Sequence, residues 1–76
     1  MDKYIQVKLI PSLIPRFKSI INGKIYKVVE IGNYWYNKYS IINESGNLCK
    51  YADSHFVPSS LLLYLIQEKG KNKNNG

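Results

Sequence analysis

The chain predicts a mainly β fold, a small barrel of five strands that ends in a short helix or an extra strand. Three observations support this prediction. Residues 4–10 alternate between apolar and polar side chains, residues 23–46 hold two β-rich runs around an aromatic cluster, and turn residues separate the runs. A length of 76 residues corresponds to one domain. We place that domain at residues 1–69 and expect the polar, basic tail at residues 70–76 to be disordered.

The first half of the chain predicts two strands joined by a long loop. Every second residue of 4–10 is apolar, as in a half-buried strand, and Pro11 ends this strand because it has no N–H group to donate. Residues 11–22 contain two prolines and predict a partly packed loop that can hold one turn of helix. Residues 24–31 are apolar on both faces, which predicts a strand that lies between two layers or bends at a bulge.

The second half predicts a hairpin. Residues 39–43 and 48–51 have strand composition, and the turn at residues 44–47 contains Gly46, which can adopt the positive φ of a tight hairpin turn.

After the hairpin we expect a single helical turn within residues 52–56, with Asp53 or Ser54 near its start as the cap. Residues 56–58 predict a short closing strand, which its proline confines to a sheet edge. Ser59 or Ser60 can then cap a helix over residues 61–69, and a sixth strand is the alternative for this apolar run.

The formal net charge is +6, which suggests nucleic acid or another anionic partner. However, Arg16 is the only arginine, and Lys69, Lys71 and Lys73 belong to the polar tail, so the charge of the rest is ordinary for a soluble protein. We therefore favour a solvated basic surface over a nucleic-acid site. The longest apolar run is far shorter than the roughly 20 residues of a membrane span, and we expect a cytoplasmic protein without membrane contact.

The sequence holds no pattern typical of a catalytic or metal site. Cys49 and His55 are the sole residues of their types, and the five acidic residues are scattered. Zinc sites need three or four ligands in a defined geometry, and acid–base catalysis needs paired groups. We therefore predict a protein that is not an enzyme and needs no cofactor or metal.

Three stretches of the chain resemble a known family. They are GKIYKVVEI at residues 23–31, YSIINESGNL at residues 39–48 and KYADSHF at residues 50–56. In this order they are similar to the small SH3-like β-barrel proteins of phages and prophages of low-GC Gram-positive bacteria. The resemblance covers about 35 residues and concerns the fold more than chemistry. It implies an SH3-like five-stranded barrel, a phage origin, a location in the host cytoplasm, and binding to a bacterial host protein as an inhibitor or modulator of that protein.

The strongest candidate for a partner-binding site is the aromatic cluster Tyr34, Trp35, Tyr36 and Tyr39. Tyrosine and tryptophan are enriched at interaction hot spots because they combine a large apolar area with a polar tip. Read as a strand, this stretch would place Tyr34 and Tyr36 on one side and Trp35 on the other. The alternative is that Trp35 fills the barrel and the tyrosines shield its end.

Basic residues are interleaved with the aromatic residues, and we add Arg16 and Lys38 to the candidate partner-binding site. The same composition suits a single-strand nucleic-acid surface, which is the alternative function.

The apolar run near the C-terminus is a candidate oligomer interface. Contiguous exposed apolar surface usually marks an interaction site. A homodimer is therefore one expectation, and packing back onto the barrel or onto a target is the other. The four residues proposed for this interface are Leu61, Leu62, Leu65 and Ile66.

Overall fold

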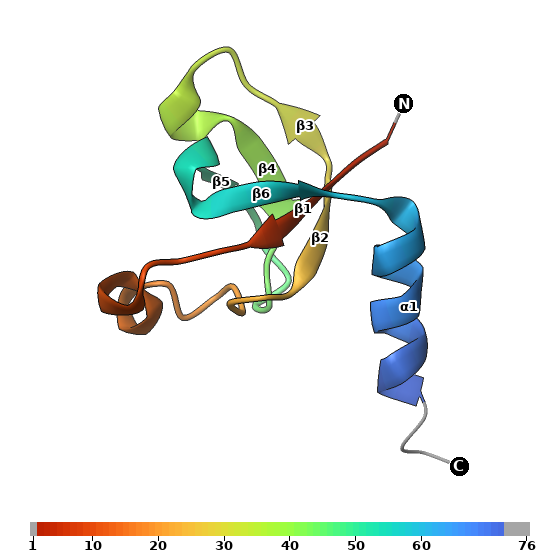
Figure 1. The fold of residues 1–76 in the computed structure, drawn as a ribbon. Coiled ribbons are helices and arrows are strands. Elements are labelled where there is room, and N and C mark those ends of the chain that lie inside the picture. Colours follow the sequence, from red (N-terminus) through yellow and green to blue (C-terminus); the bar gives the residue numbers. More distant parts are fainter. Residues whose placement is uncertain (1, 73–76) are drawn as a thin grey trace.

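The computed structural model describes residues 2–72 of the chain, and the side chains of residues 2–70. Six strands, three short 3₁₀ turns and one α-helix follow one another along this part of the chain (Figure 1). In order they are β1 (Lys3–Val7), η1 (Pro11–Arg16), β2 (Ile25–Val28), β3 (Glu30–Ile31), η2 (Trp35–Asn37), β4 (Tyr39–Ile42), β5 (Leu48–Tyr51), η3 (Asp53–His55), β6 (Phe56–Ser59) and α1 (Leu61–Asn72).

The strands form two antiparallel sheets of three strands each. The strand order is β2-β1-β6 in one sheet and β3-β4-β5 in the other. Only Val29 separates β2 from β3, and its N–H donates to the carbonyl of Ser40 at 2.8 Å. One bent strand therefore belongs to both sheets, and of the two alternatives predicted for residues 24–31 the bend is the one that the structure shows.

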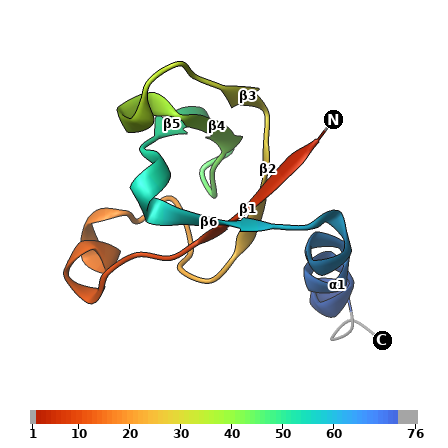
Figure 2. The same cartoon turned by 45° about the horizontal axis from the view of Figure 1, so that its top comes forward.

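The fold class is confirmed as mainly β with a short C-terminal helix, but the expected closed barrel is not formed. The strands group into two separate sheets rather than one continuous ladder, because the chain changes direction at Val29 and each half of the bent strand pairs with a different neighbour. Figure 2 shows the two sheets turned relative to each other, with the bent strand joining them.

The core lies between the two sheets. Alternate residues of the N-terminal stretch point into it, as predicted: Ile5, Val7 and Leu9 are all buried. Beyond Val7 the chain leaves the ladder, because the Lys8 N–H donates to the carbonyl of His55 and the Leu9 N–H donates to the side-chain oxygen of Asn22. The buried cluster consists of Ile5, Val7, Leu9, Ile20, Tyr26, Val28, Ile41 and Phe56.

The predicted turns are present. Gly46 has φ +81° and its N–H donates to the Asn43 carbonyl, which closes the β4–β5 hairpin. The single helical turn η3 follows where expected, but neither Asp53 nor Ser54 caps it. Its N-cap is Ala52, and no side chain accepts from its free N–H groups.

The apolar run near the C-terminus forms the helix α1, not the alternative sixth strand. The Ser60 hydroxyl caps the helix by accepting from the Leu63 N–H at 3.2 Å, as predicted. The helix continues to Asn72, three residues beyond the expected end, and residues 73–76 of the expected tail lie outside the described part. In the described part, no helix has the length and apolar character needed to cross a membrane.

Candidate functional site

The three aromatic residues between β3 and β4 form an exposed turn, which we call the aromatic turn: Tyr34, Trp35 and Tyr36. The Tyr34 and Tyr36 rings stack with centroids 5.4 Å apart and planes 7° apart, and the Trp35 ring meets that of Tyr36 edge-on at 5.6 Å. The exposed fractions of these residues are 59%, 63% and 55%. The rings thus contact one another while most of their surface faces solvent.

The backbone of the aromatic turn is held at its base. The Gly32 N–H donates to the Lys38 carbonyl at 2.8 Å, and the Asn37 N–H donates to the Tyr34 carbonyl at 3.2 Å. A Cβ at Gly32 would overlap the carbonyl oxygen of Asn37, so only glycine fits where the two ends of the turn approach. The turn therefore presents its rings from a closed loop.

The base of the aromatic turn carries one unsatisfied polar atom. The side-chain oxygen of Asn37 is buried and has no hydrogen-bond partner in the described structure. A buried acceptor left unpaired costs about 1–3 kcal/mol. The turn is therefore tight enough around Asn37 to bury this atom.

The strand geometry expected for these aromatic residues is wrong. The alternation of a strand would separate Trp35 from its neighbours, whereas η2 is a 3₁₀ turn and keeps all three rings on the surface. The alternative in which Trp35 fills the core is wrong, because that residue is the most exposed of the three.

The other predicted members of the site lie apart from the aromatic turn to different degrees. Tyr39 is half-buried, and its ring packs edge-on against Phe56 at 5.7 Å, so it belongs to the margin of the core. Lys38 directly follows η2 and is half-buried. Arg16 is exposed on η1, which Figure 1 shows at another corner of the same side, with η3 between η1 and η2.

A row of partly exposed rings, which the sequence reasoning missed as a site, lies beside the aromatic turn. The Phe17 ring lies 4.7 Å from that of His55 and 6.2 Å from that of Tyr51, which packs against Phe56 at 6.1 Å. Phe17 directly follows η1, His55 belongs to η3 and Tyr51 to β5, whereas Phe56 of β6 is buried beneath them; η2 packs against η3 and β5. The aromatic turn thus extends into a broader aromatic surface. In the sequence, Tyr51 and Phe56 stand in the KYADSHF stretch, which indicated a fold and gave no sign of a binding surface.

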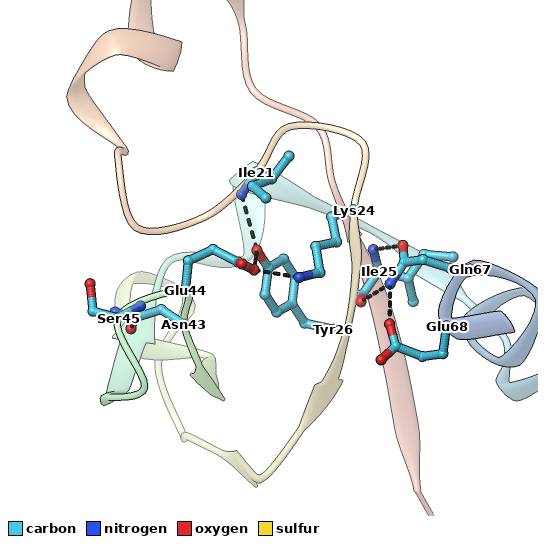
Figure 3. A network of polar contacts seen from close by, with 9 residues as sticks. All are labelled: Ile21, Lys24, Ile25, Tyr26, Asn43, Glu44, Ser45, Gln67 and Glu68. Carbon is cyan, nitrogen blue, oxygen red and sulfur yellow. Dashed lines mark hydrogen bonds and ion pairs between the residues drawn. The ribbon is translucent and has the colours of Figure 1, made fainter. Parts of the chain in front are cut away.

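A network of polar contacts lies away from the aromatic turn, between β2 and the β4–β5 turn (Figure 3). The Tyr26 hydroxyl accepts from the Ile21 N–H at 3.0 Å and donates to the Glu44 carboxylate at 2.6 Å, and Lys24 pairs with the same carboxylate at 2.6 Å. Burial and the hydrogen bond to Glu44 raise the pKa of Tyr26 above its ordinary value. This network ties the β4–β5 turn to β2.

The polar network borders a cleft of about 430 Å³ between β2, the β4–β5 turn and α1. On its helix side, the Gln67 side chain makes two hydrogen bonds to the backbone of Ile25. Among residues 2–70, no three His, Cys, Asp or Glu side chains gather in a metal-binding arrangement.

Comparison of the chain with protein families, with curated protein sequences and with solved structures found no match. A function is therefore inferred from the geometry of the aromatic turn and of its surroundings.

Proposed function

We propose that this protein is a non-enzymatic protein-binding module and that the aromatic turn is its main contact surface. The observation that carries the proposal is the exposure of three mutually packed aromatic rings on one short turn. Such rings lose favourable burial by facing water, and they bring large apolar area to a partner at little cost in side-chain entropy. Because the rings already pack against one another, binding would need little further ordering of the turn.

We also propose that the two sheets represent an SH3-like arrangement. What supports this is the order of elements: a strand, a long loop, a bent strand, a hairpin, a single helical turn and a short strand. In SH3-like proteins generally, aromatic residues near these loops line a peptide groove. The aromatic turn lies between β3 and β4, and Phe17 follows η1 in the long loop, with its ring 6.2 Å from that of Tyr51 at the end of β5, which is consistent with such a groove.

The resemblance of residues 23–56 to phage and prophage proteins suggests the class of partner. We propose a bacterial host protein, bound in the host cytoplasm and inhibited or modulated by the contact. This role needs neither a cofactor nor a metal.

The test is capture from a lysate of a Gram-positive host, with and without nuclease, using wild-type protein and two variants. Trp35→Ala and Tyr36→Ala remove exposed rings, so both variants should keep the wild-type melting temperature within about 3 °C. Wild type should capture one nuclease-resistant protein, and both variants should lose it. Ile10→Ala removes an equally exposed apolar side chain outside the turn, and it should retain the partner. Retention by both ring variants would show that the aromatic turn is not the contact surface.

A second candidate function is binding of single-stranded nucleic acid by the same surface. The observation that favours it is the combination of a +6 charge with the parallel Tyr34–Tyr36 pair, whose outer faces could stack on bases. Binding of an oligonucleotide should then weaken steeply with salt. Capture that disappears after nuclease treatment would favour this function over protein binding.

A further inference from the structure

One side of α1 presents an apolar face to solvent, and Leu63, which is also 51% exposed, lies on the helix outside this face. The apolar face consists of Leu61, Leu62, Leu65 and Ile66, whose exposed fractions are 51%, 67%, 53% and 57%. We propose that this face is a homodimer interface, on which α1 of a second copy packs in antiparallel orientation. This proposal is independent of the aromatic turn.

The opposite face of α1 is fixed to the body of the protein. The Tyr64 ring packs on the Tyr4 ring of β1, with centroids 5.0 Å apart. The Gln67 side chain accepts from the Ile25 N–H at 2.7 Å and donates to the Ile25 carbonyl at 2.9 Å (Figure 3). The helix cannot rotate its apolar face towards β2 without breaking these contacts. The apolar face therefore stays outward in the monomer, where only another molecule can cover it.

The apolar face is complementary to itself. Its residues occupy helix positions i, i+1, i+4 and i+5, which lie on one side of a helix. A two-fold axis across the middle of the face would place Leu61 opposite Ile66 and Leu62 opposite Leu65, in both directions. Every apolar residue would thus meet an apolar residue, as an isologous interface requires.

The charges at the ends of the face fit the same arrangement. The antiparallel register places the exposed Lys69 of one copy near the start of α1 of the other, where β6 leads into the helix. Pro58 lines a hollow at the start of α1 that is also lined by Asp2. Lys69 would therefore approach the side of the partner copy that carries Asp2, whose carboxylate pairs with Lys27 of its own copy at 3.5 Å. A parallel pair would instead place the two Lys69 side chains together.

The area agrees with a weak homodimer. Four side chains that are more than half exposed form a patch of about 400 Å², comparable to the largest apolar patch on a typical monomer. Two such patches would bury about 800 Å² of apolar surface. At the roughly 65% apolar content of homodimer interfaces, this corresponds to about 1,200 Å² in total, the lower end of stable interfaces. We therefore expect dissociation in the micromolar range.

The test is sedimentation equilibrium of the full chain between about 1 and 500 μM, a range that brackets micromolar dissociation. Wild type should change from 8.8 kDa to twice that mass as the concentration rises. Leu62→Glu and Leu65→Lys each place two unpaired charges in the interface and should each weaken the dimer about 100-fold. The control Ile10→Glu changes an equally exposed residue directly before η1, which lies on the opposite side of the molecule from α1 (Figure 1), and it should dimerise like wild type.

Mixing the two helix variants tests the orientation. In the antiparallel arrangement the new carboxylate at position 62 lies opposite the new ammonium at position 65, so the mixture should form a heterodimer within about tenfold of wild-type affinity. A parallel pair offers no such rescue. The proposal is overturned if wild type remains monomeric throughout, if Leu62→Glu dimerises like wild type, or if the mixture does not associate.

Discussion

Replacement of Gln67 tests whether its side chain completes the outer edge of β2. Its amide takes the place of a neighbouring strand, since it pairs with both backbone groups of one residue, Ile25. Gln67→Ala removes two hydrogen bonds, each worth about 0.5–1.5 kcal/mol net, so the total loss is about 1–3 kcal/mol. A free helix of this length is marginal in water, so detachment should also reduce its helicity.

The assay is native-state hydrogen exchange at the Ile25 amide. A loss of 1–3 kcal/mol corresponds to about a 5- to 150-fold fall in protection. Lys69→Ala, an exposed change on the same helix, is the matched control and should leave the exchange unaltered. Gln67→Glu keeps an acceptor for the Ile25 N–H but loses the donor to its carbonyl, so it should lose protection as well. Unchanged exchange in Gln67→Ala would refute the assignment of Gln67 as the edge partner of β2.

Two further predictions concern the polar network and the aromatic turn. The raised pKa of Tyr26 means that the folded protein keeps a proton that the unfolded chain releases near pH 10, so the free energy of unfolding should fall above about pH 10 by up to 1.4 kcal/mol per pH unit. In urea unfolding at pH 9 and pH 11, Tyr26→Phe should therefore lose less stability between the two pH values than wild type does. An equal loss in both proteins would contradict the prediction. Gly32→Ala should disrupt the aromatic turn, which would be measured as a shift in Trp35 fluorescence and a loss of partner capture. The control Gly70→Ala adds a Cβ where there is open space and should change neither property. Fluorescence like that of wild type in Gly32→Ala would contradict the close approach of Gly32 to Asn37.

Features that depend on neighbouring residues could be predicted from the sequence. The inward alternation of Ile5 and Val7 follows from the two-residue period of a strand, the positive φ of Gly46 from the demands of a tight turn, and the cap on α1 from the hydroxyl of Ser60. Each of these needs only a few residues on either side. The apolar pattern on both faces of residues 24–31 gave a bend as one of two alternatives, but it did not place the bend at Val29, and Val29 and Ile31 are more than half exposed.

Features that depend on distant residues could not be predicted. Gln67 and Ile25 are 42 residues apart, and a glutamine in an apolar helix gives no sign that its amide will bind a strand edge. The geometry of the aromatic turn could not be predicted for a related reason. The alternation rule assumes a strand, and only the close approach of Gly32 to Asn37 shows that the backbone turns instead. A closed barrel could likewise not be distinguished from two sheets, because both have the same order of strands.

The two proposed surfaces would act together. The aromatic turn and α1 lie on opposite sides of the molecule in both views (Figures 1 and 2). A dimer formed through α1 would therefore carry two aromatic turns that point away from its axis, and neither would be covered. Against an oligomeric partner, such a dimer would gain avidity of about 10²–10⁴ over one site. Leu62→Glu, which leaves the aromatic turn intact, should then weaken capture of an oligomeric partner while leaving affinity for an isolated partner subunit unchanged.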